Sequence, residues 1–589
     1  MVAATGLVGN CSFNALITGG RVSWLCWPRP DSSFVFGELI GGEEAGVYAI
    51  EPAGPHTVHV EYVDNTNILR TVFRGVDGDN WAFELIDFAP RFLLFGRWFR
   101  PTMLMRILRR LEGEPRIRVR CEPVYDYGRA RPQVWGASNH LQFGGLSAPL
   151  RLTTNAPLTY VRQGTPFLLT RDLHFVLTWG EPLEAPLEDT TESFYCQTRD
   201  AWRRWVKSGR IPREWQPEVI RSALTLKLHQ FDDTGALLAA TTTSLPESPG
   251  SGRTWDYRYC WLRDAYFTID AFERLGYAEE MEKFLLYLRN LCGDGHSELQ
   301  PVYGIDLAAD LEEHILDHLK GFQGDGPVRI GNQAYAQVQH DVYGELILSM
   351  SRLLLDSRFR GDEGVDGAGH LVQGLVSQIE QKLEEPDAGL WELRGSRYLH
   401  TFTLLTHWAG ARRAVDIAKA LGIDGLRDKS KQVMARASQL LWERCWNEKI
   451  GSFTQAAGRD NLDASSLLAL HFGFLRGDDP RARRMVDAIK KQLELPNGML
   501  KRYDVEDDFG VPDAAFTVCT FWLVDALAMV GRADDARALF DSVLARHNGL
   551  GLFAEDLLTG GATQSGNFPQ TYSHVGLINA AFRLSRAWD

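Results

Sequence analysis

The stretch 254–264 runs Thr-Trp-Asp-Tyr-Arg-Tyr-Cys-Trp-Leu-Arg-Asp, and the prediction of the fold starts from it. It places four aromatic rings beside two arginines and two aspartates, and the apolar run 265–272 that follows predicts a buried helix. Aromatic rings beside an Arg–Asp pair at a helix start suit a sugar, because ring faces stack and hydroxyls take charge-assisted hydrogen bonds. The alternative is a strip of core aromatics with a structural ion pair.

Length and composition predict a soluble protein of more than one domain. The 589 residues suffice for two or three domains, and 44% apolar with 24% charged residues is ordinary for globular proteins. The net charge of −13 argues against nonspecific nucleic-acid binding, which needs a cationic surface. No apolar run reaches the roughly 18 residues of a membrane span, and no signal peptide is visible. We therefore expect a cytoplasmic protein without nucleic-acid or membrane partners, and the oligomeric state stays open.

Cysteine and histidine spacing predicts no metal site. The eight cysteines form no CxxC pair, and most lie in apolar runs, where we expect buried free thiols. His314 and His318 are four residues apart and could share a helix face, but a metal would need further ligands. The sequence also contains no P-loop, no GxSxG and no Rossmann fingerprint.

The N-terminal third is predicted to be β-rich. The runs 58–62, 67–73 and 81–88 are short and rich in β-branched and aromatic residues, and 117–121 alternates between apolar and polar side chains. Many short strands separated by turns predict an antiparallel β-sandwich, which we assign to residues 1–186.

The rest of the chain is predicted to be helical, with a linker helix in 187–212 and a helical domain in 213–589. About a dozen helices in pairs predict a closed ring of helical hairpins, an (α/α) barrel; a solenoid is the alternative, but no fixed-period repeat is present. The candidate helices span 215–230, 264–275, 278–292, 334–355, 367–384, 398–410, 412–421, 425–446, 464–474, 481–494, 513–530, 533–547 and 572–586.

Two loop glutamates are candidates for acid–base chemistry. Glu392 follows a tryptophan, and a carboxyl held against apolar rings has the raised pKa that a general acid requires; the alternative is a surface glutamate paired with Arg394 or Arg397. Glu555 ends a glycine-rich apolar run, where polar neighbours would keep a base ionised; the alternative is a loop carboxylate beside Asp556. Together they fit inverting glycoside hydrolysis, which needs one protonated and one ionised carboxyl.

Six segments together resemble glycoside hydrolase family 15, which holds glucoamylases, glucodextranases and a branch of trehalases. They are Trp-Asp-Tyr-Arg-Tyr-Cys-Trp-Leu-Arg-Asp at 255–264, Pro-Val-Arg-Ile-Gly-Asn at 327–332, Asp-Val-Tyr-Gly-Glu at 341–345, Gly-Leu-Trp-Glu at 389–392, Gly-Asn-Phe-Pro-Gln at 566–570 and, similar to the start of prokaryotic two-domain members, Trp-Leu-Cys-Trp-Pro-Arg-Pro-Asp-Ser at 24–32.

The resemblance implies an N-terminal antiparallel β-sandwich followed by a catalytic (α/α)6 barrel that removes α-linked glucose from non-reducing ends with inversion. It implies these roles: Glu392 as general acid, Glu555 as general base, Tyr257 at the reacting centre, Arg263 and Asp264 on hydroxyls of the terminal glucose, Trp261 and Trp391 as pocket walls, and Arg502 as a further sugar-binding arginine. The alternative for Arg502 is a solvated loop cation. Two positions depart from the family pattern: Asp513 stands where Glu is common, and Phe322 where Tyr or Trp is usual. Both are expected near loops that shape the substrate subsites.

We therefore predict an exo-acting, inverting α-glucosidase of glucoamylase type that acts on an α-glucoside or α-glucan oligosaccharide. The chemistry needs no cofactor, because two carboxyls about 6.5–9.5 Å apart and one water suffice. Three alternatives stay open: a trehalase acting on α,α-trehalose, an α-1,6-specific glucohydrolase acting on isomaltose or dextran ends, and a noncatalytic carbohydrate-binding protein. The presence of both Glu392 and Glu555 argues against the last.

Overall fold

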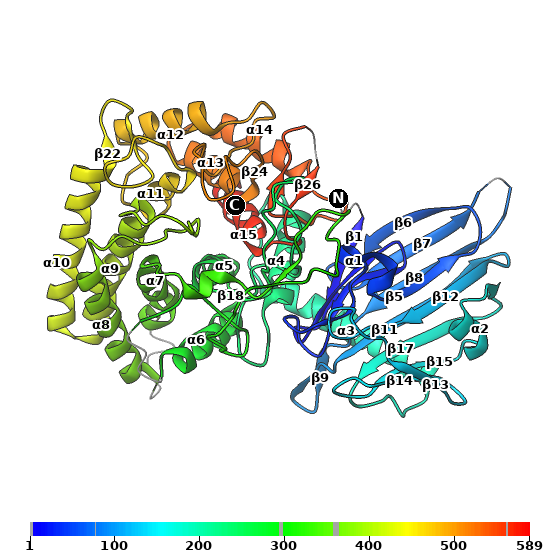
Figure 1. Ribbon diagram of the computed structural model, residues 1–589. Helices are drawn as coiled ribbons and strands as arrows, with labels where there is room; N and C mark the ends of the chain where they lie inside the picture. The colour runs from blue at the N-terminus through cyan, green and yellow to red at the C-terminus, as the bar shows by residue number, and fades with distance from the viewer. Residues whose placement is uncertain (1–3, 77, 294–297, 357–363, 561–562, 589) are drawn as a thin grey trace.

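The protein consists of a β-sandwich followed by a helical barrel (Figure 1). The computed structural model describes residues 4–588 apart from 77, 294–297, 357–363 and 561–562. The predicted fold class, an antiparallel β-sandwich followed by an (α/α)6 barrel, is confirmed.

Two antiparallel sheets form the N-terminal part. The first has the order β1-β2-β3-β5-β12-β16, with β4 paired to β3: β1 Thr5–Gly9, β2 Asn14–Thr18, β3 Arg21–Cys26, β4 Phe34–Phe36, β5 Val47–Pro52, β12 Arg116–Glu122 and β16 Phe167–Leu168. The second has the order β13-β14-β15-β17-β11-β8-β7-β6: β6 His56–Tyr62, β7 Leu69–Gly75, β8 Ala82–Phe88, β11 Met103–Glu112, β13 Gln133–Gly136, β14 His140–Gly144, β15 Leu150–Thr154 and β17 Leu173–Trp179. Strand β12 buries alternate side chains, as the sequence pattern predicts for a half-buried strand.

Helix α3, Leu187–Ser208, covers the segment predicted as a linker helix. It packs on the second sheet, where the ring of Tyr195 contacts Phe88 with centroids 5.9 Å apart. Trp202 on the same helix is buried in a cluster that the sandwich and the barrel share. The helix therefore belongs to the packed interface between the two parts.

Twelve helices of the described residues alternate between an outer and an inner ring (Figure 1). The inner helices are α5 Leu262–Leu275, α7 Asp341–Leu355, α9 Thr401–Leu421, α11 Leu468–His471 with the 3₁₀ turn Ala464–Leu467 before it, α13 Thr517–Met529 and α15 Thr571–Leu584. The outer helices are α4 Gln216–His229, α6 Ala278–Cys292, α8 Gly364–Lys382, α10 Asp424–Leu440, α12 Pro480–Leu493 and α14 Ala533–Leu544. Helix α15 packs on both α13 and α5, so the ring closes and the solenoid alternative is excluded.

Short elements connect these helices and strands. They are α1 Glu38–Gly41, α2 Leu158–Gln163, β9 Phe92–Leu94, β10 Arg97–Phe99, β18 Cys260–Trp261, β19 Val302–Tyr303, β20 His314–Ile315, β21 Arg329–Ile330, β22 Trp446–Asn447, β23 Ser452–Phe453, β24 Ala515–Phe516, β25 Asp556–Leu557 and β26 Gln564–Ser565. The predicted helix face shared by His314 and His318 is wrong, because His314 lies in strand β20.

Two helix boundaries were predicted wrongly. The candidate helix 334–355 begins only at Asp341, because Gln333–Ala336 form a separate 3₁₀ turn. The candidate helices 398–410 and 412–421 form the single helix α9. Gly410 lies inside it, and a Cβ at this position would stand 2.8 Å from the Cα of Gly344 on α7. The glycine thus allows α7 and α9 to approach closely instead of ending a helix.

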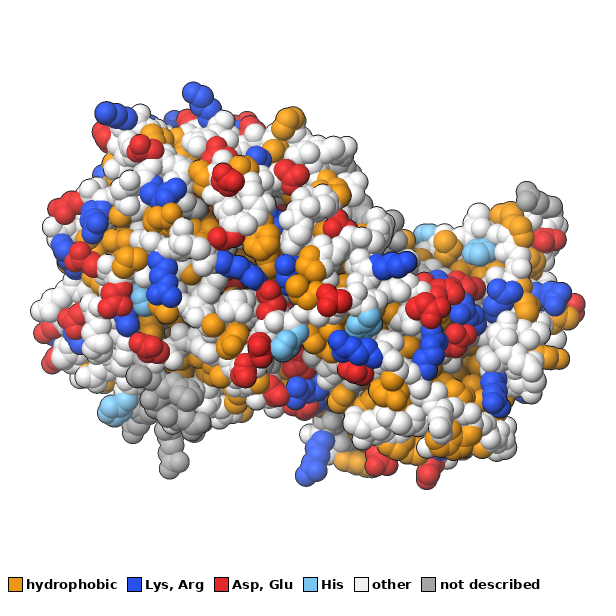
Figure 2. Space-filling view, viewed as in Figure 1, with side chains coloured by type: hydrophobic (Ala, Val, Ile, Leu, Met, Phe, Trp, Pro, Cys, Tyr) orange, Lys and Arg blue, Asp and Glu red, His pale blue; other side chains and the backbone are white. Residues whose placement is uncertain are grey.

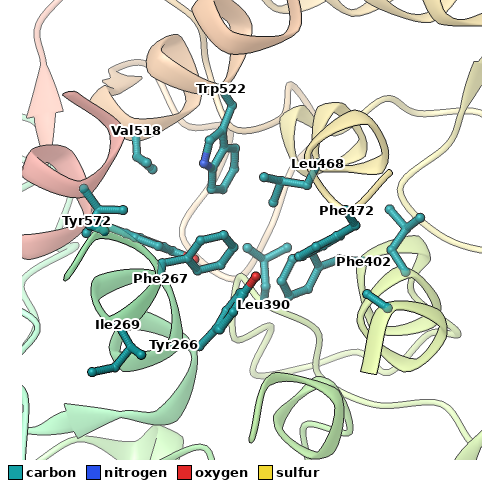
Figure 3. Packing of buried hydrophobic residues seen from close by; sticks show 14 of the residues in the cluster. Tyr266, Phe267, Ile269, Leu390, Phe402, Leu468, Phe472, Val518, Trp522 and Tyr572 are labelled. Atoms are coloured by element: carbon teal, nitrogen blue, oxygen red, sulfur yellow. The ribbon is translucent and has the colours of Figure 1, made fainter. Parts of the chain in front are cut away.

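The centre of the barrel is filled by side chains from the inner helices (Figure 3). The ring of Phe267 on α5 lies 5.1 Å from that of Tyr572, 6.4 Å from that of Trp522 and 6.5 Å from that of Phe472, measured between centroids. This packing closes the barrel axis. A ligand site can therefore form only at an end of the ring, where the loops lie.

Three further observations concern the cysteines, the possibility of a membrane span and the distribution of charge on the surface. All eight cysteines are free, and six of them are buried. No helix of the described residues is long and apolar enough to cross a membrane. Cationic and anionic side chains are interspersed over the face seen in Figure 2, without an extended basic patch there.

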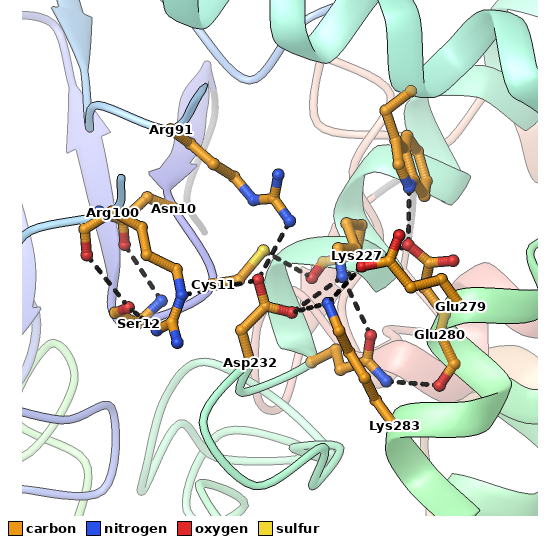
Figure 4. A network of polar contacts seen from close by, with 12 residues as sticks. Asn10, Cys11, Ser12, Arg91, Arg100, Lys227, Asp232, Glu279, Glu280 and Lys283 are labelled. Carbon is orange, nitrogen blue, oxygen red and sulfur yellow. Dashed lines mark hydrogen bonds and ion pairs between the residues drawn. The ribbon is translucent and has the colours of Figure 1, made fainter. Parts of the chain in front are cut away.

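A buried ion network joins the sandwich to the barrel (Figure 4). The carboxylate of Asp232, which follows α4, accepts from Arg91 of the sandwich at 3.0 Å, from Lys227 of α4 at 3.1 Å and from Lys283 of α6 at 2.9 Å. Burial alone would raise the pKa of Asp232, but the three cations outweigh burial and lower it well below its usual range. The carboxylate therefore stabilises the contact between the two parts while it is ionised.

We expect Asp232→Ala to lower the free energy of unfolding by about 3–5 kcal/mol, because it leaves buried cations without their partner. Thermal and urea unfolding measure this. The contribution of the ionised carboxylate is present above the ordinary aspartate pKa of about 3.9 and is lost as the pH falls towards the lowered value. Asp233→Ala is the matched control, since the neighbouring Asp233 is exposed and should matter little. Equal effects of the two variants would contradict the role of Asp232.

Candidate active site

A pocket opens at the N-terminal ends of the inner helices, with an empty volume of about 860 Å³ including its mouth. The segments of the barrel singled out in the sequence lie in the loops that enter α5, α7, α9, α13 and α15 or in the first turns of α5 and α7. Seven of the eight predicted site residues line the pocket: Tyr257, Trp261, Arg263, Asp264, Trp391, Glu392 and Arg502. The eighth, Glu555, is fully buried and accepts a hydrogen bond from the Tyr257 hydroxyl at 2.7 Å.

The first turn of α5 supplies Arg263 and Asp264 to the buried end of the pocket. The guanidinium of Arg263 donates to Gln339 at 2.9 Å and Asp341 at 3.1 Å, so its direction is fixed. The carboxyl of Asp264 has no hydrogen-bond partner among the described side chains, which leaves it available to a ligand. Burial raises the pKa of Asp264 to about 7, although the Arg263 charge opposes the shift.

Glu392 faces the same pocket from the loop before α9. Its Oε1 accepts from Trp261 Nε1 at 2.6 Å, from Arg263 at 3.2 Å and from Gln339 at 3.4 Å. Its Oε2 has no partner among the described residues and is free to meet a substrate. The expectation of an apolar surround is therefore wrong, since N–H groups hold this carboxyl. Its backbone φ of 61° lies in the left-handed region, which is unusual for a residue other than glycine.

Glu392 is not a surface glutamate paired with Arg394, because Arg394 pairs instead with Glu313 at 2.8 Å. The carboxyl side chain of Glu392 is 23% exposed and turned to the pocket. The resemblance-based placement of Glu392 in a sugar pocket thus agrees with the geometry.

Glu555 is held by a small sheet that joins three loop segments. Strand β25 pairs with β24 before α13 and with β26, which leads to Asn567. The two carboxylate oxygens accept from the Tyr257 hydroxyl at 2.7 Å and from the backbone N–H of Asn567 at 3.2 Å. Burial raises the pKa of Glu555 to about 8, and the negative charge of Glu247 adds to the rise, while Tyr257 opposes it. The expectation that polar neighbours keep Glu555 readily ionised is wrong, because burial outweighs their effect on its pKa.

Two touching rings connect the two glutamates. Trp261 donates to Glu392, Tyr257 donates to Glu555, and the rings of Tyr257 and Trp261 meet edge to face with centroids 5.4 Å apart. The fold thus brings together two carboxyls that are 163 positions apart in sequence (555 − 392). The separation of about 6.5–9.5 Å that inversion requires stays a prediction.

Trp391 and Arg502 form another wall of the pocket. The indole N–H of Trp391 donates to Asp463 at 2.7 Å, and its ring meets Phe516 at 5.4 Å. Arg502 is only 8% exposed and donates to Glu247 at 2.8 Å. The alternative of a solvated loop cation at this position is therefore wrong.

Sequence reasoning missed several residues of the pocket. Gln337 lines the pocket, and Gln339 contacts Arg263 and Glu392; both precede α7, although the sequence predicted a helix over 334–355. Glu247 lies in the long loop 242–256, where a ligand site could be expected, but nothing in its composition singles out this glutamate. Neither departure from the family pattern lines the pocket, since Phe322 borders a different cavity and Asp513 is exposed. Asp513 nevertheless follows the loop that brings Asp507, Asp508 and Phe509 to the pocket, so the expectation that it lies near such a loop is met.

The comparisons with known proteins agree with this geometry. A family model described as glycosyl hydrolases family 15 matches residues 216–582. The chain belongs to this family. A second model, described as trehalase-like, N-terminal, matches residues 2–160. As a member of family 15, the protein is an inverting glycoside hydrolase that acts on a glucoside.

Relatives match along the whole chain. A trehalase of Mycolicibacterium smegmatis is 33% identical over 623 aligned residues, which cover 100% of this chain and 91% of that protein. A trehalase of Mycobacterium tuberculosis is 33% identical, with 96% of this chain and 87% of that protein covered. The crystal structure of a bacterial glucoamylase complexed with acarbose has a TM-score of 0.68 at 14% identity, covering 99% of this chain and 94% of that chain, and so shares the fold.

We expect the acidic limb of the kcat/KM profile to lie well above the ordinary glutamate pKa of about 4.3. A base must be ionised to act, and the raised pKa of Glu555 means that activity is lost as the pH falls through a value approaching 8. Tyr257→Phe removes a hydrogen bond that opposes this rise, so its acidic limb should move to higher pH.

The matched control for this experiment is Tyr259→Phe, because the Tyr259 hydroxyl accepts from the backbone of Gly331 and does not touch Glu555. Its acidic limb should coincide with that of the wild type. A limb near pH 4 in the wild type, or a shift to lower pH in Tyr257→Phe, would contradict the assignment.

Proposed function

We propose that the protein is a trehalase, which hydrolyses α,α-trehalose to two glucose molecules with inversion at one anomeric carbon. The observation that carries this proposal is the match over nearly the full length, sandwich included, to proteins named trehalase at 33% identity. The likeness to glucoamylase is one of fold at 14% identity. The trehalase alternative therefore fits better than the glucoamylase-type prediction.

In the proposed mechanism Glu392 is the general acid and Glu555 the general base. The free Oε2 of Glu392 protonates the glycosidic oxygen as the bond to the leaving glucose breaks. Glu555 takes a proton from a water molecule that attacks the anomeric carbon from the opposite side. The hydrogen bond from Tyr257 orients the base and stabilises its ionised form, which the reaction requires.

The buried end of the pocket is proposed to bind the terminal glucose. Arg263 and Asp264 take its hydroxyls, Arg263 as a fixed donor and Asp264 as a carboxyl without another side-chain partner. The rings of Trp261 and Trp391 offer apolar faces to the sugar ring. Arg502 contributes a further donor from the side of the base.

The open end of the pocket is proposed to take the leaving glucose. The loops at this end are tied together: Arg253 donates to Asp507 at 2.8 Å, the backbone N–H of Arg394 donates to Asp508 at 2.7 Å, and the Arg394 side chain pairs with Glu313. Side chains of both charges surround this end, where they can bind several hydroxyls. A rim fixed in this way suits a leaving group of one sugar better than a long chain.

The products test the reaction directly. Both anomeric carbons of trehalose have the α configuration and share one oxygen, so inversion at one of them releases β-glucose while the other leaves as α-glucose. We expect equal amounts of the two anomers in ¹H NMR spectra recorded before mutarotation. Release of α-glucose alone would contradict inversion. Faster hydrolysis of maltose, isomaltose, maltoheptaose or starch than of trehalose would contradict the proposed substrate.

The glutamate pair is tested by substitution. We expect Glu392→Gln and Glu555→Gln each to lower kcat by about 10²–10⁴-fold while the circular dichroism spectrum stays that of the wild type. Glu312→Gln, at an exposed position outside the pocket, is the control and should keep wild-type turnover. Wild-type turnover in either catalytic variant would refute the role of that residue.

A further inference from the structure

A further glutamate, Glu247, lines the pocket on the side of the base. We propose that Glu247 is a positioning residue for the hydrolysis, which orients Arg502 towards the substrate and places a second negative charge beside Glu555. The proposal rests on the proposed role of Glu555 as general base. It adds a residue that acts through two others and does not touch the reacting atoms.

Hydrogen bonds fix the Glu247 side chain at both oxygens. Oε2 accepts from the guanidinium of Arg502 at 2.8 Å, and Oε1 accepts from the indole N–H of Trp255 at 3.0 Å. The Glu247 side chain is only 5% exposed. A buried carboxylate held by two N–H donors, one of them charged, has a single orientation.

Arg502 depends on this contact for its direction. Its guanidinium lies 5.7 Å from the ring centroid of Phe516 and 5.9 Å from that of Trp391, between aromatic walls that offer no ionic partner. Among the described residues Glu247 is the one carboxylate that pairs with it. Arg502 itself lines the pocket, while its Nε is buried and has no hydrogen-bond partner among the described residues.

Backbone hydrogen bonds tie the segment of Glu247 to the loop that holds the base. Ser565 Oγ donates to the carbonyl of Glu247 at 2.7 Å, and the N–H of Gly566 donates to the carbonyl of Pro246 at 2.7 Å. A Cβ at Gly566 would stand 2.7 Å from Oε2 of Glu555, so this loop lies directly against the catalytic carboxyl. The place of Glu247 relative to Glu555 is therefore fixed by the fold.

The charges around the base do not balance. Arg502 pairs with Glu247, and Arg253 pairs with Asp507 and also acts on Asp556, so two guanidinium groups face the buried carboxyls Glu247, Glu555 and Asp556 together with Asp507. The groups that act on Glu555 are Glu247, Arg502, the Tyr257 hydroxyl and the N–H of Asn567, and Glu555 in turn acts on Asp556. The negative charge of Glu247 opposes ionisation of Glu555 and so raises the pKa of Glu555.

The test is Glu247→Gln, which keeps the shape and removes the charge. We expect the acidic limb of kcat/KM to move to lower pH, because Glu555 then ionises more easily, and KM to rise roughly tenfold, because the charge-assisted bond to Arg502 is lost. Glu247→Asp keeps the charge on a shorter side chain, so KM should rise while the limb stays near that of the wild type. Arg502→Gln should move the limb in the opposite direction, to higher pH.

Asp508→Asn is the control, because Asp508 lines the same pocket but does not act on Glu555, and its limb should not move. The assays use whichever glucoside the wild type hydrolyses fastest, so the test does not depend on trehalose. Full turnover in Glu555→Gln would refute the base itself. If Glu555→Gln is inactive and Glu247→Gln folds, an acidic limb that stays in place or moves to higher pH in Glu247→Gln overturns the proposal. If Glu247→Gln does not fold, a wild-type KM in Glu247→Asp overturns it.

Discussion

The packing of aromatic side chains along the barrel axis is the constraint on which the site depends. Phe267, Trp522 and Tyr572 fill the centre of the ring, so no ligand can enter along it (Figure 3). The loops before α5, α7, α9, α13 and α15 meet at one end, and each contributes residues to the pocket. Residues that are far apart in the sequence thereby come within hydrogen-bonding distance of one another at this end of the closed ring. The sandwich is joined to this ring through buried ions around Asp232 (Figure 4).

The surroundings of Glu392 and Glu555 in the folded protein, and not their neighbours in sequence, determine the properties of the two carboxyls. Glu392 lies among N–H donors at the pocket wall, whereas Glu555 lies behind Tyr257 without solvent contact. The two carboxyls therefore differ in environment, and it is the proposed base, Glu555, whose pKa burial raises. The pKa of Glu555 also depends on neighbouring charges, above all on Glu247 and Arg502.

Much of the fold was predictable because it follows from periodicity. Alternating strands such as β12 and the apolar spacing of the twelve helices identified both parts of the chain. The prediction of two helices in place of α9 was wrong because a glycine can allow close helix packing as well as end a helix. Only the contact of Gly410 with α7 shows which of these roles it has. The motif residues of the pocket were identified by resemblance, while their surroundings were not. Neither the donors around Glu392 nor the contact of Glu247 with Arg502 is local in sequence, so neither could be derived from it.

The most direct test of the account is a crystal structure of Glu555→Gln with uncleaved trehalose. The account predicts one glucose ring at the buried end, hydrogen-bonded to Arg263 and Asp264, and the Glu392 carboxyl beside the glycosidic oxygen. The side chains at 392 and 555 should lie on opposite faces of the bond, about 6.5–9.5 Å apart. A separation of about 5 Å, typical of retaining enzymes, or a sugar bound away from the first turn of α5 would contradict it.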